Sequence, residues 1–487
     1  MLNLRRVLGI VGVLLLVGGS IYGADLSLDT ELYSTGGLFT NPLFPAENSS
    51  VKITVRAVIE GKVNSDIKAN VGIAAPGGEV INELIVLELD EGKNTATGSI
   101  DWKTLGNGQY FITATVDPNN DIAESDEKNN AGTIELPVVV DGRQPHFPWY
   151  GSVPHLRWAT IWTNSNKKGV ERWGERGVKA LRWTYGTNLG GEWDANVVSE
   201  KLGAILDGYP GFGADECGGY ATEATWDKFK KYTDGLKLIK KRMPDKFLYI
   251  WHCGSTYPEQ MAMYRGACDL VVLESYVFYW GPKSLGHENY YTGLDTKMLP
   301  AWQADLLGPT GKGTQVITSV DLTSTHHKGS EKAFNRGKFE EVVRHLRRKW
   351  PEMRGIGFYH STGNVANDQF VDRVVHDYFL MPVVTVRPGN LWVNKQDDGS
   401  YVITAAVSNI GAMDSGAVAV KFYVDGKLLK STMLSKVPAG NNILENQVRV
   451  EAKWMPGSGG HDLTVELGPA AGSMILDYKQ ANNYYVP

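Results

Sequence analysis

Two neighbouring acids lie in a glycine-rich stretch, GFGADECGG at 211–219, and a third acid ends an apolar run farther along the chain. Asp215 and Glu216 follow the run GFGA, and Glu274 follows LVVL. A carboxylate beside a buried strand is costly unless it is paired or functional. The surrounding glycines would let a large ligand approach the backbone. Two carboxylates that flank one bond can protonate the leaving oxygen and attack the carbon, or activate water against it, which is the chemistry of glycosidic-bond cleavage.

The spacing suggests separate roles for these acids. Mutual repulsion between neighbouring carboxylates raises the pKa of at least one of them, which suits a proton donor. We therefore expect Glu216 to act as general acid and Glu274 as nucleophile or base. Asp215 would orient the substrate as an ionised group, or be the catalyst itself, because adjacent side chains on a regular strand point to opposite sides.

Six further residues end or follow strand-like runs and are candidates for binding the substrate. They are Trp162, Tyr185, His252, Tyr276, Trp280 and His360. Sugar sites use aromatic faces against C–H surfaces and polar groups against hydroxyls. Packing in the core is the alternative for each of them. No HExxH motif, GxSxG motif or phosphate-binding loop occurs, so we expect no metal and no cofactor.

The central segment, 143–387, alternates strand-like and helical patterns. Seven strand-like runs are evident, LRWATIW, VKALRWTYG, GFGADE, FLYIWHCG, LVVLESYVF, TQVITSV and GIGFYH, and helical patterns such as TWDKFKKYTDGLKLIKKRM lie between several of them. This alternation predicts a (β/α)8 barrel, with some distortion allowed. The eighth strand is expected near 204–208 or near 299–302. A doubly wound sheet is the alternative, although no GxGxxG turn follows the first strand.

Composition also marks the central segment as the working part of the chain. It holds 11 of the 14 tryptophans and nine of the ten histidines. Catalytic residues of such barrels lie at the carboxyl ends of the strands, where the acids above are found.

The flanking segments, 25–142 and 388–487, have short alternating runs separated by turn residues, which predicts an antiparallel β-sandwich on each side. An Asp425-Gly426 pair indicates a hairpin in the second. Each segment ends in an acid, a lysine and an Asn-Asn pair before a last strand, DPNNDIAESDEKNNAGTIELPV in one and LDYKQANNYYV in the other. These endings resemble CARDB modules, which are immunoglobulin-like adhesion domains of exported bacterial proteins.

The central segment resembles TIM-barrel glycoside hydrolases in general. The nearest pattern is the clan with Asn-Glu after strand four and Glu after strand seven, from which this chain departs with Asp-Glu and an earlier second Glu. The resemblance implies cleavage of a polysaccharide. Two other functions fit the same residues: a non-catalytic glycan-binding or adhesion protein, and a polysaccharide lyase that uses Tyr185, His252 and Arg182.

The chain begins with two arginines and an apolar run from Val7 to Ile21, which is typical of a signal peptide over 1–24. We therefore expect a secreted, periplasmic or cell-surface protein whose sandwiches attach it to the surface or to the polymer. The net charge of −5 argues against nucleic acid as a partner. Three cysteines, Cys217, Cys253 and Cys268, are too few for a disulfide scaffold, and burial is expected for most of them.

Overall fold

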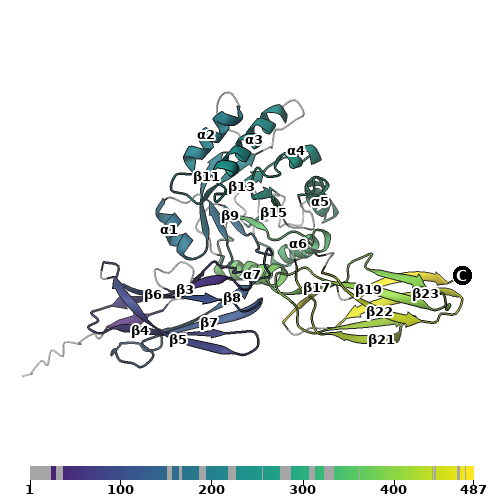
Figure 1. The fold of residues 1–487 in the computed structure, drawn as a ribbon, viewed down its shortest axis with the longest axis horizontal. Helices are drawn as coiled ribbons and strands as arrows, with labels where there is room; N and C mark the ends of the chain where they lie inside the picture. The colour runs from purple at the N-terminus through teal and green to yellow at the C-terminus, as the bar shows by residue number, and fades with distance from the viewer. Residues whose placement is uncertain are drawn as a thin grey trace, which may run out of the picture.

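A computed structural model shows a barrel set on two β-sandwiches, with the chain running from one sandwich through the barrel to the other (Figure 1). It describes residues 24–28, 37–90, 92–150, 156–163, 167–185, 194–217, 226–254, 256–274, 287–306, 313–322, 334–360, 362–440, 443, 446–468, 472–477 and 479–486. The expected signal peptide lies outside these residues, apart from Ala24.

The N-terminal sandwich follows from strict alternation, with Val51, Ile53 and Val55 buried in its core. Its strand order is β1-β3-β6-β5-β4-β7-β8, and β2 pairs with β3. The strands are β1 (Asp25–Ser27), β2 (Gly37–Asn41), β3 (Ser50–Glu60), β4 (Ile67–Ala74), β5 (Val80–Asp90), β6 (Thr95–Lys103), β7 (Gly108–Val116) and β8 (Ala131–Val138).

The centre of the molecule is a closed barrel of eight parallel strands, and this excludes the doubly wound alternative. In chain order the strands are β9 (Pro148–Tyr150), β10 (Ile161–Thr163), β11 (Lys179–Tyr185), β12 (Gly211–Cys217), β13 (Phe247–His252), β14 (Leu270–Leu273), β15 (Gln315–Asp321) and β16 (Gly357–Tyr359). Each strand pairs with its neighbour in this order, and β9 closes the ring between β16 and β10.

The expected position of the eighth strand was wrong. Residues 204–208 cover the end of a helix and a turn, and 299–302 lie inside another helix. The missing strand is β9, which precedes the seven that were recognised. Its three residues are too few to show the alternation by which a strand is read from sequence.

Helices connect the strands from β10 onward. They are α1 (Lys167–Glu175), α2 (Ala195–Ile205), α3 (Trp226–Arg242), α4 (Pro258–Met263), α5 (His287–Gln303), α6 (Arg336–Lys349) and α7 (Val365–Val375), which continues into a π-helical turn, η2 (His376–Leu380). The two helical patterns read most clearly from sequence, around α3 and α6, are confirmed. Figure 1 shows α7 at the base of the barrel, between the two sandwiches.

The C-terminal sandwich has two sheets. One has the order β18-β19-β17-β24, with β22 on β19, and the other has the order β21-β20-β23-β25. The strands are β17 (Val383–Thr385), β18 (Leu391–Lys395), β19 (Tyr401–Asn409), β20 (Val418–Val424), β21 (Lys427–Leu434), β22 (Val448–Trp454), β23 (Gly459–Leu467), β24 (Met474–Asp477) and β25 (Lys479–Val486). The hairpin is confirmed, since Asp425 and Gly426 have φ of 50° and 74° between the paired β20 and β21.

Buried arginines join the C-terminal sandwich to the barrel. Arg143 donates to the carbonyls of Ile410 and Gly411 at 2.7 and 2.9 Å, and Arg347 also donates to the Ile410 carbonyl. Removing one partner of such a buried charged hydrogen bond is costly. The sandwich is therefore fixed to the barrel.

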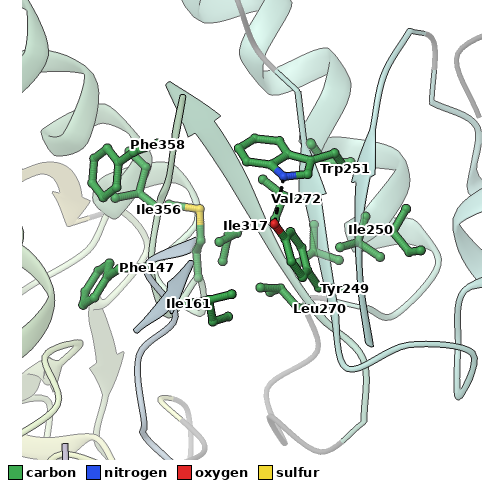
Figure 2. Packing of buried hydrophobic residues seen from close by; sticks show 14 of the residues in the cluster. Phe147, Ile161, Tyr249, Ile250, Trp251, Leu270, Val272, Ile317, Ile356 and Phe358 are labelled. Carbon is green, nitrogen blue, oxygen red and sulfur yellow. Dashed lines mark hydrogen bonds between the residues drawn. The ribbon is translucent and has the colours of Figure 1, made fainter. Parts of the chain in front are cut away.

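A chain of hydrogen bonds closes the barrel interior below its carboxyl end. Trp251 Nε1 donates to the Tyr249 hydroxyl at 3.2 Å, which donates to Thr163 Oγ1 at 2.9 Å, which donates to the Trp149 carbonyl at 2.9 Å. Figure 2 shows the first of these bonds and the two β13 rings. Gly213 on β12 leaves the room that the Tyr249 ring occupies. This glycine therefore serves packing, not the approach of a ligand as the sequence suggested.

Substitution of Gly213 by alanine tests this packing. The added Cβ would lie 2.6 Å from both Tyr249 Cζ and Thr163 Cγ2, so these side chains must shift. We expect Gly213→Ala to lower the free energy of unfolding by about 1–3 kcal/mol, measured by urea denaturation. The control is Gly174→Ala in α1, where a Cβ meets nothing within 4 Å. Equal stability of the two variants would contradict the close packing of Gly213 against Tyr249 and Thr163.

Candidate active site

Three acids lie at the carboxyl ends of barrel strands and face the barrel interior. Asp215 lies near the end of β12, Glu274 follows β14, and Asp321 ends β15. Glu274 and Asp321 are two residues beyond Val272 and Ser319, which a Cβ at Gly357 would touch inside the barrel, so they share the inward side of their strands. Their exposed fractions are 8%, 6% and 0%. The carboxyl end of the barrel therefore carries a concentration of buried acids, as the chemistry of a catalytic site requires.

The Asp215 carboxylate accepts a hydrogen bond from a tyrosine of β9, which is separated from β12 by β10 and β11 in the barrel. The Tyr150 hydroxyl donates to Asp215 Oδ2 at 3.0 Å. Burial, and then the Asp215 charge, raise the pKa of Tyr150 far above its usual value, so the phenol keeps its proton and remains a donor. A hydrogen bond to the ionised form favours that form. Asp215 is thus suited to act as an ionised carboxylate.

Aromatic rings surround this carboxylate. The Tyr150 ring stacks on Tyr359 with centroids 5.2 Å apart and planes 13° apart, and it meets Trp251 edge-on at 5.9 Å. Trp183 lies at 6.3 Å from the same ring. Four strands contribute these rings. Such surfaces suit the C–H face of a sugar ring.

Glu274 lies on the far side of β13 from Asp215. Its N–H donates to the His252 carbonyl at 2.8 Å, which extends the ladder by one residue. Lys297 of α5 donates to the Glu274 carbonyl. Burial lowers the pKa of Lys297, and the nearby Glu274 charge opposes this. Adjacent strands are about 4.8 Å apart, so the two acids stand on backbones about 10 Å apart and face one interior.

His360 lies beside these aromatic rings, at the carboxyl end of β16. Its N–H donates to the Tyr150 carbonyl at 3.0 Å, and its ring meets Tyr359 edge-on at 4.1 Å. Its φ of 56° lies in the left-handed region, which is uncommon for a non-glycine residue. Such strain often marks functional sites. His360 therefore lies with these aromatic rings at the carboxyl end of the barrel.

Two of the expected substrate residues point away from the interior. Trp162 packs edge-on against Trp173 of α1 at 5.5 Å, and His252 Nδ1 shares a 2.9 Å hydrogen bond with the Tyr264 hydroxyl after α4. Both belong to the layer between strands and helices. The prediction took the last polar or aromatic residue of each run, but alternation turns Thr163 and Trp251 inward instead.

The strand is irregular at the acid pair. Ala214 is opposite Ile250 and Cys217 is opposite His252, so β12 has one extra residue here, a β-bulge. Tyr185 is paired by backbone with Asp215. The side chains of Tyr185 and Glu216 lie outside the described part of the structure, and so do Tyr276 and Trp280 altogether.

Sequence reasoning missed four aromatic residues of this site, Tyr150, Trp183, Trp251 and Tyr359. Tyr150 lies on the unrecognised β9. The other three each stand one or two residues before a residue that was chosen. Inward-facing positions recur at every second residue of a strand, so counting from residues inside the barrel, such as Tyr249 or Gly357, leads to Trp251 and Tyr359. Asp321 directly follows the run TQVITSV and is not among the residues predicted from sequence.

Within the described residues, no group of three histidine, cysteine, aspartate or glutamate side chains could hold a metal ion. No described helix is long and apolar enough to cross a membrane. Cys217 and Cys268 are buried, as expected.

The CARDB family model matches residues 37–134 and 380–486, and no curated protein matches the chain. Among solved structures, the CARDB domain of a Pyrococcus furiosus protein in complex with di-metal ions is 23% identical, covers 25% of this chain and 99% of its own, and has a TM-score of 0.20. A Bacteroides uniformis β-glucuronidase is 12% identical over 95% of this chain and 62% of its own, with a TM-score of 0.29. A putative β-galactosidase from Bacteroides fragilis is 10% identical over 94% and 74%, with a TM-score of 0.27.

Removal of the Tyr150 hydroxyl tests the support of Asp215. Tyr150→Phe should lower the free energy of unfolding by about 1–3 kcal/mol, because a charge-assisted hydrogen bond is lost and the carboxylate stays buried. Urea denaturation at neutral pH measures the loss, with the exposed Tyr257→Phe as control. A loss no larger than that of Tyr257→Phe would contradict the support of Asp215 by this hydrogen bond.

Proposed function

We propose that the chain is a secreted glycoside hydrolase that cleaves a polysaccharide with two carboxylates at the mouth of the barrel. One observation carries this proposal: Asp215, whose carboxyl accepts a hydrogen bond from Tyr150, shares the barrel interior with a second buried acid, Glu274. One ionised carboxylate and one proton donor are the requirement for hydrolysis of a glycosidic bond.

The roles follow from the contacts. Asp215 is the nucleophile or the base, because its hydrogen bond favours the charged form. Glu274 is then the proton donor. This reverses the expectation that Glu274 is the nucleophile and Glu216 the acid. Glu216 lies within the bulge, and the experiment below includes it.

Strand order offers a rival for the second acid. With β9 as the first strand, Asp215 and Glu216 end the fourth strand, as in the clan that the sequence resembles. Glu274 follows the sixth strand and Asp321 ends the seventh, where that clan has its second acid. Asp321 is fully buried. We favour Glu274 because this residue is 6% exposed, whereas Asp321 is fully buried.

Four variants separate these assignments. Asp215→Asn and Glu274→Gln should each lower kcat by at least about a thousandfold, since each removes a group that acts on the reacting bond. Glu216→Gln and Asp321→Asn should lower it by less than about tenfold. Circular dichroism checks folding, and release of reducing ends from a panel of neutral, acidic and sulfated polysaccharides measures turnover.

Two rescue experiments then assign the roles. A substrate with an activated leaving group should restore much of the rate of Glu274→Gln, because it needs no proton donor. Azide should restore turnover to Asp215→Ala and yield a glycosyl azide if the route is retaining. Near wild-type turnover in both Asp215→Asn and Glu274→Gln would refute this pair. Unsaturated products, seen by ultraviolet absorbance, would indicate a lyase, and binding without any product would indicate a non-catalytic glycan-binding protein.

The proposed location rests on the first 24 residues. The basic start, the apolar run and Ala24 are the parts of an export signal. Expression with this segment should give a mature protein outside the cytoplasm that begins near Asp25, as N-terminal sequencing would show. Retention of residues 1–24 in the exported protein would point instead to an N-terminal anchor.

A further inference from the structure

A second cleft lies where the N-terminal sandwich meets the barrel. Its walls are β2 and β8 of the sandwich and, on the barrel side, Trp158, Arg176 and one face of α7. The volume of about 690 Å³ is within the usual range of ligand sites. Among the described residues that line it, none belongs to the candidate active site. The hydrolysis proposed above does not account for this cleft.

One face of α7 carries four of the polar side chains of the cleft. Asp368, Gln369, Asp372 and Arg373 line it at helical spacing, together with Val365 at the first turn. Val365 is 71% exposed, which is high for an apolar side chain on a helix between two domains. This face is therefore open to a ligand.

The walls are held together without a ligand. Arg157 lies 3.8 Å from Glu135 of β8, donates to its carbonyl at 3.3 Å, and lies over the Trp158 ring at 4.7 Å. Asn41 of β2 donates to the Gly174 carbonyl at 2.9 Å. A preformed cleft loses little free energy to ordering when a ligand binds.

Asp372 borders this cleft with a carboxyl whose hydrogen bonding is incomplete. Its Oδ2 accepts from the Arg157 N–H at 3.0 Å, and its buried Oδ1 has no hydrogen bond of normal geometry, although the backbone N–H of Trp158 also acts to lower the pKa of this carboxyl. Buried polar atoms normally have a partner, and one without a partner calls for an explanation. Burial raises the pKa of Asp372 to about 7, so near neutrality the carboxyl can accept or donate.

The charges select the class of ligand. An anion would meet Asp368 and Asp372, and a cation would meet Arg157, Arg176 and Arg373. A hydroxyl accepts one hydrogen bond and donates another, so it can bridge an arginine and a carboxyl. Leu38, Phe39 and Leu43 form the apolar base of the cleft, where the Arg176 guanidinium lies over the Phe39 ring at 4.4 Å.

We propose that this cleft binds a neutral oligosaccharide segment, with hydroxyls between Arg373, Gln369 and Asp372 and a sugar face against the β2 side chains. The site would hold a glycan chain away from the barrel mouth. It does not depend on the hydrolysis proposed above, because binding needs no turnover.

The test is calorimetric binding of cellohexaose, xylohexaose, mannohexaose and a galacturonic acid hexamer to the full chain carrying Asp215→Asn, which prevents turnover. At least one neutral hexamer should bind. Arg373→Ala and Gln369→Ala, both exposed changes on α7, should each weaken one binding event by about tenfold, or about 1.4 kcal/mol. Lys228→Ala, an exposed change on α3 outside the cleft, is the control and should bind as the parent does.

The outcomes are distinct. No binding of any neutral hexamer, or binding that neither α7 variant weakens, overturns the proposal. Preference for the galacturonic acid hexamer overturns the neutral class. If the wild-type chain hydrolyses no polysaccharide but α7-dependent binding is intact, only the proposed hydrolytic activity is refuted. Protection of α7 from hydrogen exchange by the bound hexamer would support the site independently.

Discussion

The hydrogen bond from Tyr150 to Asp215 joins the closure of the barrel to its chemistry. Tyr150 ends β9, the three-residue strand that completes the ring between β16 and β10. The same residue stacks on Tyr359, accepts from the His360 N–H and donates to Asp215. If β9 left the sheet, the barrel would open, and at the same time the Asp215 carboxylate would lose the Tyr150 hydroxyl as its hydrogen-bond donor. The stability of the barrel and the ionisation of the acid thus depend on one short strand.

In the barrel interior below the acids, glycines on some strands leave room for large aromatic side chains from other strands. Gly213 has no side chain where Tyr249 needs space, and Gly357 has none where Trp251 does. Large rings opposite glycines fill a barrel at native density without voids. The three linked donors, Trp251, Tyr249 and Thr163, satisfy their own polar atoms. This layer of the interior is therefore closely packed and its polar side-chain atoms are hydrogen-bonded, so it supports the acids at the carboxyl end of the barrel.

Much of the architecture could be predicted because its signals are repeated. Alternating runs predicted both sandwiches, and the change to strand–helix alternation predicted the barrel. The details of the site depend on single positions. Pro148–Tyr150 is too short to show a period, and the last residue of a run, such as Trp162 or His252, need not be the one that faces inward. A bulge at Asp215 also changes the alternation locally, and this cannot be read from the residue types alone.

The hydrophobic core of the barrel does not stop at the ends of the barrel. The same cluster includes Phe44 and Val139 on the N-terminal side and Ile410, Ala412 and Leu476 on the C-terminal side. The CARDB family model matches a segment at each end of this chain, and both flanking parts share some of their interior with the barrel. Replacement of the C-terminal module would cut through this core and remove the Ile410 carbonyl to which both Arg143 and Arg347 donate. A rearrangement that moved one part without the others would therefore expose apolar surface that the three parts now bury together.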